Sequence, residues 1–129
     1  MTRHESRELA FILLFEKTFT DESVEDLLQN AADARDEAAD DFACRLAKGA
    51  EAHLEELDEV LDAASYKWSK SRMSRVALSV MRLALYEMRY EDDIPVSVSI
   101  NEAVELAKTY GGEEDASFIN GVLGGIARQ

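Results

Sequence analysis

The sequence predicts an all-α fold. Proline occurs only once among the 129 residues, at position 95, so long stretches contain no residue that interrupts a helix. Apolar residues in these stretches recur at the 3.6-residue spacing of a helix and not with the alternation of a strand. The chain has no internal repeat, and its length suits one domain that buries a core without metals or disulfides.

Two helices are expected near the N-terminus. The first should run from Ser6 to Phe19, and its segment LAFILLF, residues 9–15, is apolar around nearly the whole helix. Such a helix must be enclosed by other helices or by a partner. The second should run from about Ser23 to Ala32. Its core-facing residues would be Val24, Leu27 and Leu28.

A third, longer helix is predicted from about Asp40 to Ala64. One side of it is apolar and acidic residues fill the rest, which indicates an amphipathic helix with a solvated acidic face. His53 falls on the apolar side, where we expect a hydrogen-bonded core histidine rather than a ligand. The apolar side consists of Phe42, Leu46, Ala50, His53, Leu57, Val60 and Leu61.

The segment SYKWSKSR, residues 65–72, is a junction, and the next helix should continue to Tyr90. Its three arginines, at positions 75, 82 and 89, stand seven residues apart and therefore share one face. Pro95 can open the following helix, because its missing N–H is not needed there. That helix should stop at Gly111 and Gly112, which supply the expected C-terminal cap.

The last helix contains ASFINGVL, residues 116–123, in which Asn-Gly would favour a turn. The apolar residues around the pair have helical spacing, so we expect a helix that packs closely against a neighbour through Gly121. A frayed C-terminus is the alternative, and it is our expectation for Gly124 and Gly125.

Charge is distributed unevenly along the chain, whose net charge is −13. Residues 21–62 hold fifteen acidic residues against three basic ones, whereas residues 63–86 hold five basic residues and no acid. A basic segment of this kind can mark a nucleic-acid surface, although a solvated helix face is the commoner cause. The net charge alone therefore does not exclude nucleic-acid binding.

No catalytic constellation can be assembled from the sequence, and we expect neither an enzyme nor a cofactor nor a bound metal. Cys44 and His53 would point to opposite sides of the predicted helix, which excludes a dyad. Glu87 falls on an apolar helix face, where we expect a structural carboxylate that accepts hydrogen bonds from a neighbouring helix end. One cysteine, no visible signal peptide and no long apolar segment favour a cytoplasmic protein.

The C-terminal half resembles the NusB family of bacterial transcription antitermination factors. The similarity is continuous over residues 80–127 and lies in MRLALYEM, the acidic turn with IP, INEAVELAKTYG and SFINGVL. SRELAFILLFE and YKWSKSRMSRV match the family more loosely. The resemblance implies about seven helices in one NusB-like RNA-binding domain over residues 1–129. Its two small subdomains would span residues 1–64 and 65–129.

The resemblance also implies a function and partners. NusB proteins pair with NusE, a small-subunit ribosomal protein, and the pair binds boxA RNA as part of the RNA polymerase antitermination complex on ribosomal RNA operons. No membrane is involved. The family's RNA surface would correspond here to a basic N-terminal segment, an aromatic in the first helix and the start of the last helix. These residues are Arg3, His4, Arg7, Phe15, Glu114 and Phe118.

Core packing is the alternative for Phe15 and Phe118. The partner-binding residues implied by the resemblance are Ser71, Arg75 and Ala77, but relatives commonly carry an acid at the place of Ala77. Two more departures are the acids Glu5 and Glu8 beside the N-terminal arginines and the GVLGG ending. The acidity of the chain and its weakened N-terminal arginine segment leave open a different class of function, a helical protein-interaction module of NusB fold that has lost RNA recognition. A homodimer that hides the arginine face is a variant of it.

Overall fold

The computed structural model describes residues 2–35, 41–65 and 73–129. These residues form seven α-helices, which confirms the predicted all-α fold. The helices are α1 (Arg3–Lys17), α2 (Val24–Arg35), α3 (Asp41–Ala52), α4 (Leu54–Ala64), α5 (Arg75–Tyr90), α6 (Val96–Tyr110) and α7 (Glu113–Ala127).

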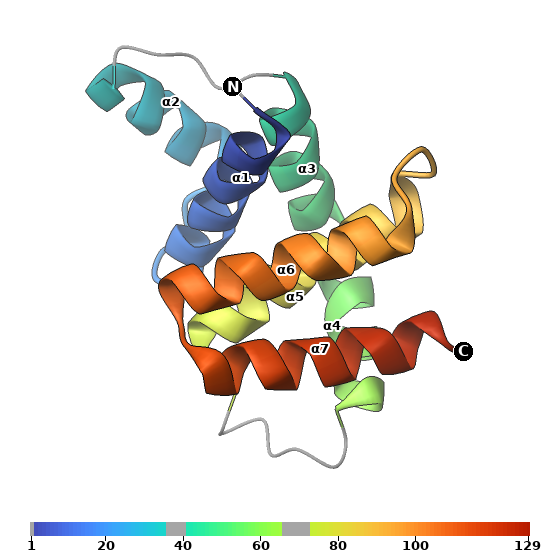
Figure 1. Ribbon diagram of the computed structural model, residues 1–129. Coiled ribbons are helices and arrows are strands. Elements are labelled where there is room, and N and C mark those ends of the chain that lie inside the picture. The colour runs from blue at the N-terminus through green and yellow to red at the C-terminus, as the bar shows by residue number, and fades with distance from the viewer. Residues whose placement is uncertain (1, 36–40, 66–72) are drawn as a thin grey trace.

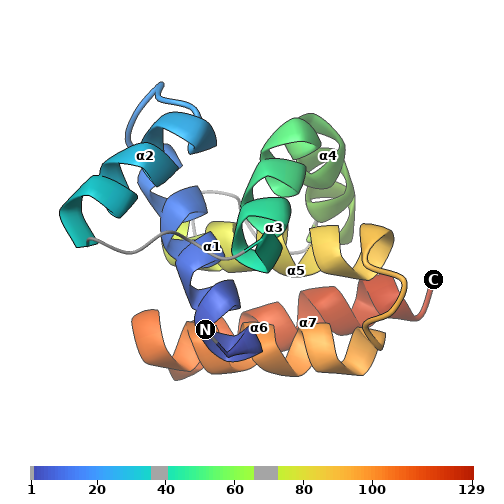
Figure 2. The same cartoon turned by 90° about the horizontal axis from the view of Figure 1, so that it is seen from above.

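Helix α5 is the centre of the bundle and contacts α1, α3, α4, α6 and α7. Helices α6 and α7 run antiparallel on one side of α5 (Figure 1), while α2, α3 and α4 lie on the other side (Figure 2). Helix α1 crosses between the two sides. Because α5 is enclosed in this way, most of its residues from Ala77 to Glu87 are buried.

Helix α1 begins three residues earlier than its apolar pattern predicts. Thr2 caps it, since the Thr2 hydroxyl accepts a hydrogen bond from the Glu5 N–H at 3.1 Å. The Glu5 carboxylate in turn accepts one from the Thr2 N–H at 2.9 Å, which completes a capping box. The expected enclosure of the apolar segment is confirmed. Its buried residues are Leu9, Ala10, Phe11, Leu13 and Leu14.

The prediction of one helix over residues 40–64 is wrong, because the helix breaks at His53. The imidazole Nδ1 lies 2.8 Å from the Gly49 carbonyl and donates to it, and the His53 N–H bonds to Ala50 instead. In a continuous helix the Gly49 carbonyl would accept from the His53 N–H, and here it accepts from the imidazole instead. His53 accordingly leaves the helical region of backbone angles, with φ −118° and ψ 17°. Helical spacing therefore no longer fixes where this imidazole lies relative to Cys44.

The α6–α7 link falls at the predicted glycines, but not for the predicted reason. Gly111 has φ −115°, so it is not a left-handed cap. Its N–H and that of Gly112 both bond to the Ala107 carbonyl, at 2.7 and 2.8 Å. A Cβ on Gly111 would displace the Asp115 carboxylate and lie 3.1 Å from the Ala107 carbonyl oxygen, so the tight approach of the two helix ends favours glycine there.

Both expectations for the glycines of α7 are wrong. Gly121 is exposed, and a Cβ built on it would have no neighbour within 4 Å. Gly124 and Gly125 do not fray, since α7 continues to Ala127. The helix is held by its opposite face, on which Ile119, Val122 and Leu123 are buried. Asn-Gly therefore sits on the solvent side of α7.

The uneven charge of the chain is partly neutralised between neighbouring helices. On the arginine face of α5, Arg82 makes a two-point contact with Asp58 of α4 at 2.8 and 2.7 Å. Arg89 lies 3.7 Å from Glu56, also on α4. Part of the acidic surface expected to be only solvated thus pairs with the basic segment that follows it in sequence.

The predicted junction at residues 65–72 lies, from residue 66 on, outside the described residues. The boundary between the two proposed subdomains falls beside it, so that division stays a prediction. Helix α5 follows this gap and contacts helices of both proposed halves.

Two alanine substitutions should distinguish a glycine that is packed against a neighbouring side chain from a glycine that faces open space. A Cβ on Gly49 would overlap the Tyr86 ring, which is buried and stacked on Tyr90 at 5.2 Å, so Gly49→Ala should lower the free energy of unfolding by about 1–3 kcal/mol. Gly121→Ala, at an exposed helical site, should raise it by up to ~1 kcal/mol. Urea unfolding at equal m-values measures both. A Gly49→Ala protein as stable as the wild type would show that the Tyr86 ring is not held against α3.

Candidate nucleic-acid interface

The N-terminal end of α1 is fixed to α5 and α6 by a buried ion pair. The Arg7 guanidinium donates through Nε to Glu87 Oε2 at 2.9 Å and through a terminal nitrogen to Oε1 at 3.0 Å. Ser99, in the first turn of α6, donates to the same carboxylate at 3.2 Å. The exposed fractions are 5% for Arg7 and 1% for Glu87 and Ser99. Glu87 is thus a structural carboxylate, as predicted, and one of its donors is a neighbouring helix end.

This pair changes how Arg7 can take part in RNA binding. A guanidinium that is buried and bonded at two points does not face solvent as a phosphate ligand must. Removing it from Glu87 would leave an uncompensated buried charge, which typically costs 3–5 kcal/mol. Direct RNA contact by Arg7 stays a prediction, and it would require the pair to open.

Arg3 and His4 lie one turn earlier, at the exposed end of α1. The Arg3 guanidinium lies 3.8 Å above the centre of the Phe42 ring. His4 is half-exposed, and its Nδ1 lies 2.9 Å from Glu102 of α6. That hydrogen bond raises the pKa of His4, with the negative charges of Glu102 and Glu8 adding to the effect and burial and the charge of Arg7 opposing it.

Arg45 joins this surface from α3, which the sequence reasoning missed. Its guanidinium lies 5.3 Å from the Phe42 ring centre and pairs with Glu91 through two hydrogen bonds at 2.7 and 3.1 Å. Since Arg45 stands three residues after Phe42, helical spacing could have paired these two. Nothing in the spacing could have placed Arg3 on the same ring, because that contact is tertiary.

Phe15 belongs to a row of aromatic rings that follows α1. Phe11 lies 4.9 Å from the Tyr110 ring and 5.9 Å from Phe15, and Phe15 meets Phe19 edge-on at 5.2 Å. Phe11 is buried, Phe15 is half-buried against the core and Phe19 is 63% exposed. Phe15 therefore packs on the core and also has a surface from which to stack on a base.

Glu114 and Phe118 lie in the first two turns of α7. Glu114 is exposed, and Phe118 is half-buried against the core. The cationic candidates thus lie at the N-terminal end of α1, and the aromatic candidate Phe15 lies near its C-terminal end. Arg3 and Phe15 are about 18 Å apart along the helix axis.

The three candidate partner-binding residues have different environments. Arg75 is exposed at the start of α5 and donates to the Thr18 carbonyl at 2.6 Å. Ala77 is fully buried, so its methyl group is not on the surface of the free chain. Its N–H bonds to Ser74, the cap of α5, at 2.9 Å. Ser71 lies outside the described residues.

The described residues lack both a metal-binding cluster and a membrane-spanning helix. They contain no group of three or more His, Cys, Asp or Glu side chains that could hold a metal ion. None of their helices is long and apolar enough to cross a membrane.

This geometry defines a class: an all-α binding protein that presents cationic and aromatic side chains along its first helix. The chain belongs to the NusB family, whose family model matches residues 4–128. A transcription antitermination protein NusB of Clostridium botulinum (strain Kyoto / Type A2) is 44% identical, over 96% of this chain and 98% of the relative. One of Acetivibrio thermocellus is 42% identical, over 99% and 90%.

Solved structures of the family have the same fold. T. maritima NusB superposes with a TM-score of 0.89 at 37% identity, over 100% of this chain and 92% of that chain. A crystal structure of antitermination factors NusB and NusE in complex with double-stranded RNA contains a chain similar to this one. It has a TM-score of 0.85 at 25% identity, over 99% of this chain and 98% of that chain.

The contact between His4 and Glu102 predicts a pH-dependent cation on this surface. Because the folded-state pKa is raised, the pair stabilises the fold at low pH, and that stabilisation is lost as the pH rises through the raised pKa. Glu102→Gln should move the NMR titration midpoint of His4 to lower pH. Glu105→Gln, an exposed change on the same helix, is the matched control and should leave the midpoint in place. An equal midpoint in both variants would show that Glu102 does not hold the imidazole.

Proposed function

We propose that this chain is a transcription antitermination factor that binds boxA-type RNA as a heterodimer with NusE and supports transcription of ribosomal RNA operons. The observation that carries the proposal is the full-length similarity to NusB proteins, among them the NusB of a complex with NusE and double-stranded RNA. The proposed RNA surface uses Arg3 and His4 at the N-terminal end of α1, Phe15 near its C-terminal end, and Glu114 and Phe118 at the start of α7. We place its action in the cytoplasm, as part of the RNA polymerase antitermination complex, and without catalysis.

The charges on α1 support weak RNA binding by the free chain. Within the described residues, the Arg3 guanidinium pairs with no carboxylate, whereas His4 pairs with Glu102 and Arg7 with Glu87. Each free cation that meets a phosphate adds to affinity through counterion release, and few are available here. NusE would then supply the rest of the site, because two weak surfaces held side by side bind as one stronger surface.

The same pairing keeps the second candidate function open, a protein-interaction module without RNA recognition. It is favoured by the burial of Arg7 and by the acids Glu5, Glu8 and Glu102 around the remaining cations. The two functions differ in whether RNA binds at all.

Fluorescence anisotropy of a labelled boxA RNA distinguishes the two functions. We expect a weak increase in anisotropy with this chain alone and a binding curve at least tenfold tighter when its own NusE is present. An unrelated RNA of equal length is the control for nonspecific binding. If neither the chain nor the pair binds boxA RNA while NusE still binds the chain, the interaction module is the correct function.

The salt dependence of that curve should separate Arg3 from Arg7. Arg3→Ala should reduce affinity and lower the slope of log K against log salt by about 0.7, because one phosphate contact to a single strand is lost. The double change Arg7→Met, Glu87→Met replaces the buried pair by apolar groups of similar volume, which usually preserves folding. It should leave the slope unchanged. If the salt slope falls in the double variant while its helical circular dichroism is unchanged, Arg7 contacts RNA directly.

A further inference from the structure

Three arginine side chains converge on one buried ring. Phe42, at the start of α3, is 6% exposed, and the guanidinium groups of Arg3, Arg7 and Arg45 lie 3.8, 5.5 and 5.3 Å from the ring centre. They can meet there because α1 and α3 begin side by side (Figure 1). The apolar spacing of the sequence predicts only a core position for Phe42. Core packing explains why the ring is buried, but not why three cations surround it.

Two of the three cations are neutralised within the chain. Arg7 donates to the Glu87 carboxylate through two nitrogens, and Arg45 donates to the Glu91 carboxylate in the same way. These ion pairs remove most of the repulsion that three free guanidinium groups would have around one ring. They also occupy donors that another anion would need. Among the described residues, Arg3 is therefore the cation of this cluster whose charge stays free.

Arg3 is held by the ring itself and not by a carboxylate. At 3.8 Å its guanidinium carbon is in van der Waals contact with the face of Phe42, which is the geometry of a cation–π interaction. A phenylalanine side chain has no polar atom, so this contact positions the guanidinium and leaves its five N–H donors available. A carboxylate in the same place would occupy two donors and cancel the charge, as Glu87 does for Arg7.

Two acids near this end of α1 already have partners in the fold. The Glu5 carboxylate accepts from the Thr2 N–H at 2.9 Å, in the capping box of α1. Glu102 of α6 lies 2.9 Å from the imidazole of His4. An RNA phosphate that reaches Arg3 therefore has no carboxylate of the described residues to displace, whereas at His4 it competes with Glu102.

We propose that Phe42 is a positioning residue for RNA binding, whose ring holds the Arg3 guanidinium charged, in place and with its donors free for a phosphate. The inference rests on the proposed function, in which Arg3 contacts RNA. It adds a residue of α3 that neither the family resemblance nor the proposed RNA surface includes. A long side chain that is fixed before binding loses less conformational entropy when the phosphate arrives. Together with the cation–π contact, this should strengthen RNA binding by roughly three- to tenfold.

A double-mutant cycle tests whether Phe42 acts through Arg3. Phe42→Leu removes the ring but keeps an apolar side chain in the core, and Phe42→Tyr keeps the ring. In fluorescence anisotropy with labelled boxA RNA and the cognate NusE, Phe42→Leu should bind roughly three- to tenfold more weakly, and Phe42→Tyr like the wild type. In the Arg3→Ala background, Phe42→Leu should weaken binding by less than about twofold further. Helical circular dichroism and NusE binding should be unchanged in every variant.

Proton NMR of the free chain gives a readout that a purely structural role would not change. The ring current of Phe42 should shift the side-chain protons of Arg3 upfield in the wild type and in Phe42→Tyr. In Phe42→Leu this shift should be lost. Arg3 resonances that are the same in the wild type and in Phe42→Leu would show that the ring does not hold the guanidinium, and would refute the proposal.

Two results of the cycle would also refute it. In the first, Phe42→Leu binds RNA as tightly as the wild type. In the second, Phe42→Leu weakens binding by the same factor with and without Arg3, which would mean that Phe42 acts only through the packing of α3. Failure of the wild-type pair to bind boxA RNA would instead overturn the proposed function, and the NMR shift would still decide whether Phe42 holds Arg3.

Discussion

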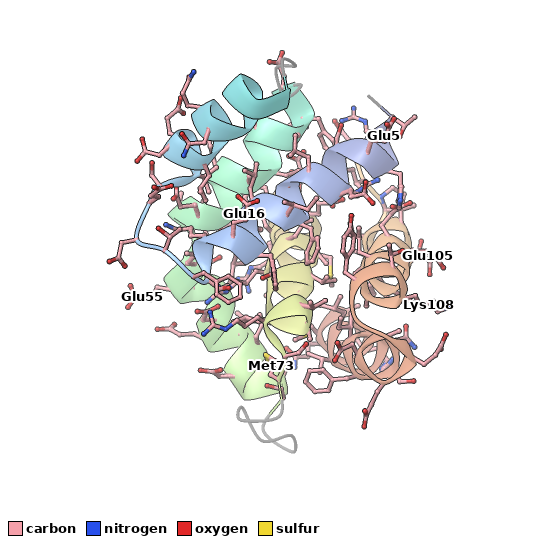
Figure 3. All side chains as sticks on the ribbon, turned by 90° about the vertical axis from the view of Figure 1, so that its left-hand side faces the viewer. Glu5, Glu16, Glu55, Met73, Glu105 and Lys108 are labelled. Carbon is pink, nitrogen blue, oxygen red and sulfur yellow. The ribbon has the colours of Figure 1, made fainter. Side chains whose placement is uncertain are left out.

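The buried pair of Arg7 and Glu87 is the interaction on which the placement of the N-terminal surface depends. It joins α1 to α5 and, through Ser99, to α6 (Figure 3 shows α1 from the side, with Glu5 and Glu16 near its two ends). Taking two charges out of water costs several kcal/mol per ion, so the two-point geometry and the third donor are needed to offset that cost. A fork that fits one carboxylate in one orientation also fixes the rotation of α1 about its own axis. Arg3 then meets the Phe42 ring and His4 meets Glu102, one turn beyond the buried pair.

Ion pairs between helices that follow one another in the chain determine which cations of this chain, whose net charge is −13, stay free. Asp58 and Glu56 of α4 face Arg82 and Arg89 of α5, and Glu25 of α2 faces Lys48 of α3. These pairs are at least partly exposed, so each adds little stability. Their effect is on the surface potential, because they remove most free cations from the middle of the molecule. Cationic character remains where no carboxylate of the described residues pairs with the cation, as at the guanidinium groups of Arg3, which lies on Phe42, and Arg75, which bonds to the Thr18 carbonyl.

The sequence was sufficient for features that depend on local periodicity, and insufficient for those that depend on a tertiary partner. The helical angle of Glu87 predicted a partly buried carboxylate, but Arg7 stands 80 residues away and no spacing rule connects the two. The break at His53 was missed because its imidazole competes with the backbone for one carbonyl, a choice that apolar spacing does not record. Gly121 was given a packing role because glycine is unfavourable inside a helix. The opposite face of α7 is buried well enough to tolerate it.

The aromatic row that follows α1 joins the core to the proposed RNA surface. Phe11, Phe15 and Phe19 stand four residues apart, so they follow one side of the helix from the core into solvent. Phe11 is held between the core and Tyr110, which makes the inner end of the row rigid. Phe15 therefore packs against Phe11 on one side and, on the other, against Phe19, whose ring is covered by Arg75. A base that stacks on Phe15 would thus meet a ring that its neighbours already position. The weakness of the cationic end then has a physical consequence: RNA binding should depend on stacking at Phe15 as well as on phosphate contacts.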